Sequence, residues 1–155
     1  MHMHAISQTK ANKSMNVSLP CYCNALRQAS RVITTFYDDQ LRPLGLRVSQ
    51  YSMLQTIRNT PGIATGSIAR ALDMDQTTAS RAIAALTREG WVLAKDGDDR
   101  REKHWTLTSK GSALLKRAEA AWRASQREIE SKLGRERATN LRAVAEEVVS
   151  AIARP

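Results

Sequence analysis

Residues 65–111 decide the fold of this chain, and they read TGSIARALDMDQTTASRAIAALTREGWVLAKDGDDRREKHWTLTSKG. Two short helical patterns follow each other here, with a tight break at Asp73-Met74 between them. Asp75 is a good N-cap for the second helix, and Gly90 supplies its C-terminal stop. The inward faces consist of Ile68 and Leu72 in the first helix and of Ala79, Ile83 and Leu86 in the second. The pattern predicts a helix, a short turn and a second helix.

After Gly90 the sequence changes from a helical to a strand-like period. Residues 91–93 read as a short strand, residues 96–99 as a turn, and residues 103–107 as the returning strand. A β-hairpin directly after two short helices is the plan of a winged helix-turn-helix domain, whose second helix is narrow enough to enter the major groove of DNA. Thr65 or Ser67 is expected to cap the first of the two helices.

Amphipathic helices are predicted on both sides of this region. One covers residues 20–42, and a shorter one follows with Ser49 as its expected N-cap. Thr108 caps a long helix over 109–132, and a last helix covers 135–153. The apolar stripes of the three long helices are too extensive for the small central region to cover, so they are expected to pack against a second copy of the chain.

The predicted fold is mainly α with a small β-wing, a winged helix-turn-helix flanked by N- and C-terminal dimerisation helices. Residues 1–18 are expected to form a flexible N-terminal arm. Residues 19–48 and 109–155 form the helical dimerisation region, and residues 49–108 form the winged helix-turn-helix DNA-binding domain, called the DNA-binding module below.

The composition favours a polyanionic partner. The chain carries 24 Lys and Arg against 15 Asp and Glu, a formal net charge of +9. Residues 1–50 contain six basic and two acidic side chains, residues 104–155 contain ten and six, and residues 70–103 contain seven of each. The excess charge therefore lies in the flanks, where it can supply non-specific attraction to phosphates.

The second helix of the DNA-binding module presents short hydrogen-bonding side chains and an Arg away from its apolar face. These candidates for contacts with base edges and phosphates are Gln76, Thr77, Thr78, Ser80 and Arg81. Arg88, near the end of this helix, is also assigned to the DNA-binding set. At the hairpin tip, Asp99 can hold the side chains of Arg100 and Arg101 extended, so that a guanidinium enters the minor groove.

Taken together, these motifs resemble the multiple antibiotic resistance regulator (MarR) family. The matching features are IARAL at 68–72, D-x-T-T-x-S-R at 75–81, L-x-x-x-G-W-V at 86–92, D-x-x-D-R-R at 96–101 and L-T-x-x-G at 107–111. The resemblance covers about residues 20–153. It implies a homodimer with intertwined terminal helices, two recognition helices on a near-palindromic double-stranded DNA operator, and a ligand crevice between the dimerisation helices and the DNA-binding module. Gly97 departs from the family pattern, in which Pro is common there.

Two switches are open for such a regulator, which we expect to be a repressor. The first is a small aromatic or phenolic effector in an apolar crevice, for which Arg27, Tyr37, Tyr51 and Met53 are candidate lining residues. The second is redox chemistry at Cys21 and Cys23 in the first turn of a helix, where a thiolate is favoured. The two side chains would point about 200° apart on a helix, which favours a bridge between subunits or a sulfenic acid over a disulfide within one chain.

Other classes of function find less support in the sequence. We expect no enzyme, because no nucleophile with a base and no phosphate-binding Gly loop is recognisable. No cofactor is expected, and the scattered His residues with a Cys-x-Cys pair match no standard metal site. A protein-docking module of the same fold is the remote alternative, although a docking face would expose apolar anchors on the helix at 76–88. Without a membrane span or a secretory signal, a cytoplasmic location is expected.

Overall fold

The computed structural model describes residues 21–96 and 103–152. The predicted arm at 1–18 and the hairpin tip with Asp99, Arg100 and Arg101 lie outside these residues. The elements, in chain order, are α1 (Tyr22–Leu41), the 3-10 helix η1 (Arg42–Leu44), α2 (Val48–Asn59), β1 (Ile63–Ala64), α3 (Thr65–Ala71), α4 (Gln76–Arg88), β2 (Val92–Asp96), β3 (Lys103–Leu107), α5 (Ser109–Leu133) and α6 (Arg135–Ile152).

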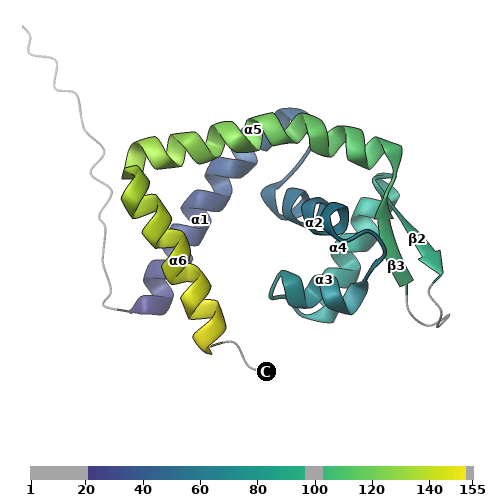
Figure 1. The fold of residues 1–155 in the computed structure, drawn as a ribbon, viewed down its shortest axis with the longest axis horizontal. Helices are drawn as coiled ribbons and strands as arrows, with labels where there is room; N and C mark the ends of the chain where they lie inside the picture. The colour runs from purple at the N-terminus through teal and green to yellow at the C-terminus, as the bar shows by residue number, and fades with distance from the viewer. Residues whose placement is uncertain (1–20, 97–102, 153–155) are drawn as a thin grey trace, which may run out of the picture.

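The long helix α5 connects the two parts of the molecule (Figure 1). At its N-terminal end lie α2, α3, α4 and the small sheet, and along its C-terminal half lie α1 and α6. The arrangement confirms the predicted fold class, mainly helical with a small β-wing. The helices expected to dimerise thus lie together although they come from the two ends of the chain.

The sheet has three antiparallel strands in the order β1-β3-β2. The predicted hairpin pairs Val92 with Leu107 and Asp96 with Lys103. The additional strand β1 pairs Ile63 with Trp105 on the other side of β3. Sequence patterns did not indicate β1, because a two-residue strand is too short to show alternation. It attaches the start of α3 to the middle of β3.

Two local signals for helix ends are confirmed. At the end of α3 the amide of Met74 donates to the carbonyl of Ala69 at 2.9 Å, and Asp73 takes a positive φ of 48°. At the end of α4 the amide of Trp91 donates to the carbonyl of Leu86 at 3.0 Å, with Gly90 at a φ of 72°. Both turns satisfy carbonyls that the last helical turn leaves free. The first of them sets the angle between α3 and α4.

Two predicted caps were wrong. Helix α2 begins at Val48, so Ser49 lies inside its first turn, and the amide of Val48 donates to the Asp38 carboxylate of α1 at 2.7 Å. Helix α3 begins at Thr65 with no side-chain cap, which excludes both Thr65 and Ser67 as N-cap residues. The hydroxyl of Thr65 accepts a hydrogen bond from the Trp105 indole at 2.9 Å, a contact across 40 residues of sequence.

The hydrophobic core lies within the DNA-binding module and continues along α5. Its fully buried side chains come from α1, α2, α3, α4 and α5, and they include Leu41, Leu54, Ile57, Ile68, Ile83, Leu86 and Leu115. No residue of the described part of α6 is buried. The core therefore joins the DNA-binding module to α1 and α5, whereas the large apolar side chains of α6 are half-buried or exposed.

Candidate nucleic-acid interface

Helix α4 is held by the packing of its apolar face against the core and by a charged N-cap at its start. Ala79, Ile83 and Leu86 are at most 1% exposed and point into the core. The Asp75 carboxylate accepts from the Thr78 amide at 2.8 Å and from the Thr78 hydroxyl. These hydrogen bonds, above all the one from the hydroxyl, hold the pKa of the Asp75 carboxyl below its ordinary value. Asp75 is therefore ionised at neutral pH, which suits the positive end of the helix dipole.

The structure exposes every predicted DNA-binding residue of α4. These are Gln76, Thr77, Thr78, Ser80, Arg81 and Arg88. Two of the hydroxyls already donate within the chain, because Ser80 Oγ donates to the carbonyl of Gln76 at 2.8 Å and Thr78 donates to Asp75. The helix thus offers a polar surface on which the hydroxyl protons of Thr78 and Ser80 are already used in hydrogen bonds within the chain.

A hollow of about 450 Å³ lies beside this surface, between α4, α3 and β3. Gln76, Ser80 and Ala84 line it from α4, and Lys103 and Trp105 line it from β3. The Trp105 ring is 8% exposed and is held to α3 through Thr65. Lys103 is exposed and adds a cation to the wall opposite α4. Lys103 is not among the residues predicted from the sequence, although it begins β3 next to the hairpin tip, and a Lys beside a recognition helix is a typical contact to phosphate.

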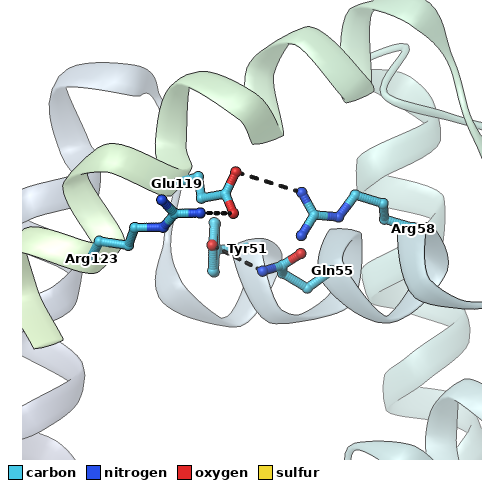
Figure 2. A network of polar contacts seen from close by, with 5 residues as sticks. All are labelled: Tyr51, Gln55, Arg58, Glu119 and Arg123. Carbon is cyan, nitrogen blue, oxygen red and sulfur yellow. Dashed lines mark hydrogen bonds and ion pairs between the residues drawn. The ribbon is translucent and has the colours of Figure 1, made fainter.

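A network of polar contacts fastens the DNA-binding module to α5 (Figure 2). Glu119 of α5 lies between Arg123, at 2.8 Å, and Arg58 of α2, at 3.9 Å. Below them, the Gln55 amide nitrogen donates to the Tyr51 hydroxyl at 3.0 Å. The Tyr51 ring stacks on Trp122 of α5, with centroids 5.9 Å apart. Exposed ion pairs contribute little, so the aromatic stack is the stronger part of this link.

The four residues expected to line an effector crevice lie in different surroundings. Tyr51 and Met53 are each 2% exposed and belong to the core. Tyr37 lines a hollow of about 390 Å³ between α1, α5 and α6, and Arg27 lies in a separate shallow depression on α1. The structure therefore does not gather the four side chains around one cavity. Burial raises the pKa of Tyr37, so its hydroxyl stays protonated at neutral pH.

Cys21 and Cys23 are both exposed free thiols at the start of α1. Cys21 occupies the N-cap position with extended backbone, so it lies outside the helix on which Cys23 stands. Within residues 21–96 and 103–152, no group of three or more His, Cys, Asp or Glu is placed to hold a metal ion. None of the helices in this part of the chain is long and apolar enough to cross a membrane.

Comparisons with known proteins agree with this architecture. Residues 46–103 match the model of the MarR family. The HTH-type transcriptional regulator YwoH of Bacillus subtilis is 35% identical over 83 residues, which are 54% of this chain and 61% of that protein. The HTH-type transcriptional repressor Rv2887 of Mycobacterium tuberculosis is 30% identical over 94 residues, 60% of this chain and 68% of that protein.

The fold also matches solved structures over most of its length. The structure of the M. tuberculosis transcriptional regulator MosR in complex with DNA has a TM-score of 0.69 and 33% identity, and the match covers 82% of this chain and 97% of that one. The chain belongs to the MarR family of winged helix-turn-helix transcriptional regulators.

Proposed function

We propose that this chain binds double-stranded DNA in a sequence-specific manner and regulates transcription as a repressor. The observation that carries the proposal is the polar, exposed face of α4, which is capped by Asp75 and bordered by the hollow with Lys103. A helix of this kind fits the major groove and reaches base edges with hydrogen-bonding side chains. Repression is supported by the relative Rv2887, which is described as a transcriptional repressor.

The active species in this proposal is a homodimer. Its support is the apolar surface left on the flanking helices, where Val32 of α1 is 70% exposed and Val144 and Ile152 of α6 are 53% and 74% exposed. Large apolar side chains that remain exposed on α1 and on α6 are typical of an interaction surface. A two-fold pair would place two copies of α4 about one turn of DNA apart, which calls for a near-palindromic operator.

The proposed effector is a small aromatic or phenolic compound. Its support is the hollow between α1, α5 and α6, whose walls are largely apolar. Among the polar residues that also line it are Tyr37, Gln126 and Arg142, and the hydroxyl of Tyr37 is protonated at neutral pH. A ligand there would lie on the helices that set the distance between the two α4 helices of a dimer, so it can favour a spacing that no longer fits the operator. Hydroxybenzoates should then release the protein from DNA, and should do so less well from Tyr37→Phe.

The DNA-binding part is tested by replacing one exposed Arg on α4 and one elsewhere. The DNA used is a duplex selected from a random pool for tight binding to the wild-type protein. Arg81→Ala should weaken binding to this duplex by about 1–3 kcal/mol if the side chain reads a base. Arg117→Ala removes the same charge from the exposed surface of α5 and is the matched control. Fluorescence anisotropy at two salt concentrations separates a specific contact from a general loss of charge. Equal effects of the two variants would contradict an interface on α4.

A further inference from the structure

The outward face of α4 can be located from its buried side. Ala79, Ile83 and Leu86 define the inward direction. At about 100° per residue, the side chains within about 50° of the opposite direction are Thr77, Arg81, Ala84 and Arg88. All four are exposed. The residues that point most directly away from the core therefore form a stripe spaced by three and four residues, which differs from the consecutive run 76–81.

The remaining polar residues lie on the two sides of this stripe. Gln76 and Ser80 border the hollow that Lys103 and Trp105 close on the side of the wing. Thr78 lies on the other side, where its hydroxyl and its amide both donate to Asp75. With its proton donated to a carboxylate, the Thr78 hydroxyl has none left for an acceptor on a base.

Thr77 differs from its neighbour in the same helical turn. Among the described residues, no hydrogen bond joins the Thr77 hydroxyl to another part of the chain, so its proton is available. Thr77 and Arg81 are four residues apart and lie on one face. Ala84 comes next on that face, and its single methyl group leaves space for close approach of another surface. The stripe thus combines three donor side chains, those of Thr77, Arg81 and Arg88, with one small residue, a set suited to acceptors on base edges.

We propose a division of labour on α4, which rests on the function proposed above. Thr77 and Arg81 read base edges, Ala84 lets the helix come close, and Gln76, Ser80 and Lys103 face the sugar-phosphate backbone along the hollow. Thr78 is a positioning residue, which orders the start of the helix through Asp75 and does not read sequence. Two adjacent residues of the same type therefore have different functions.

The adjacent threonines provide a matched experiment, because Thr77→Val and Thr78→Val remove the same hydroxyl. Each full-length variant is tested by selection from a random duplex pool and by anisotropy on the selected and on an unrelated duplex. Thr77→Val should lose about 5- to 150-fold in discrimination at one base-pair position. Thr78→Val should weaken binding to both duplexes by the same factor and leave the selected sequence unchanged.

Thr78→Ser keeps the hydroxyl and removes the methyl group, so it should restore wild-type binding and preference even if Thr78→Val folds poorly. A changed preference in Thr78→Ser, or an unchanged preference in Thr77→Val, would overturn the assignment. If wild-type protein bound no duplex above the background of unrelated DNA, the proposed function would fail together with this inference. If the wild-type protein bound its selected duplex specifically but Thr77→Val kept its preference or Thr78→Ser changed it, only this inference would be refuted, and the proposed function would stand.

Discussion

Asp75 shows how one side chain connects the fold of α4 to its surface. It caps the helix, and the hydrogen bonds from Thr78 lower the pKa of its carboxyl. A group whose pKa is lower in the folded than in the unfolded state stabilises the fold when it is ionised. This contribution is complete above the ordinary carboxyl pKa of about 4, and it is lost as the pH falls through the lowered value.

We therefore expect Asp75→Asn to alter stability in a pH-dependent way. The amide oxygen of Asn can still accept from the Thr78 backbone, but it carries no charge. Urea unfolding should show a lower free energy of unfolding for the variant than for the wild type at pH 7, and this difference should shrink as the pH falls through the lowered pKa of Asp75. A difference that stays constant across this range would mean that the charge of Asp75 does not contribute.

Residue-level signals were predictable when the partner lies close in sequence. The sequence predicts Asp75 and Thr108 as N-caps, and in the structure the side chain of each accepts a hydrogen bond from an amide three residues ahead. The start of α2 was misplaced because its amide bonds to Asp38, which is ten residues away and on another helix. The tip of the hairpin, with Asp99, Arg100 and Arg101, stays a prediction.

Among the elements, the junction between α4, the wing and α5 is held by hydrogen bonds of Thr108. The Thr108 hydroxyl donates to the carbonyl of Gly90 at 2.7 Å and accepts from the amide of Gly111 at 3.0 Å. The Thr108 amide donates to the carbonyl of Trp91 at 3.0 Å. A Cβ atom at Gly111 would collide with that carbonyl. The motif L-T-x-x-G thus fixes the end of α4 against the start of α5.

Gly111→Ala should destabilise the protein by about 2 kcal/mol or more, because backbone must move to make room for the methyl group. Gly66→Ala in α3 is the control, since nothing lies within 4 Å of its added Cβ and Ala favours helix. Thermal unfolding followed by circular dichroism gives the melting temperatures of both variants. Similar melting temperatures for the two variants would contradict the tight contact at the junction.

Element types were largely predictable because the helices here are amphipathic and long. The change of period after Gly90 also located the wing. β1 was missed, since its strand character comes from pairing with β3 and not from its own sequence. The expected crevice residues Tyr51 and Met53 turned out to be core residues, because a periodic pattern cannot distinguish a packed face from the wall of a cavity.

At the scale of the whole molecule, the exposed stripe of α6 calls for a partner. Leu141, Val144 and Ile152 are spaced by helical turns and are 38%, 53% and 74% exposed. Val144→Glu places a charge on this stripe and should weaken dimerisation at least about tenfold, whereas Val144→Leu keeps it apolar and should not. Sedimentation equilibrium gives the dissociation constants. A dimer of unchanged affinity in Val144→Glu would place the interface elsewhere.

The central claim is that two copies of α4 read one DNA duplex. Selection of bound duplexes from a random pool, performed with full-length protein at moderate salt, tests it most directly. We predict enrichment of a two-fold symmetric sequence, with half-site centres about 10 base pairs apart, and loss of that enrichment with Arg81→Ala. Enrichment of a single asymmetric site, or no enrichment above the input pool, would contradict the account.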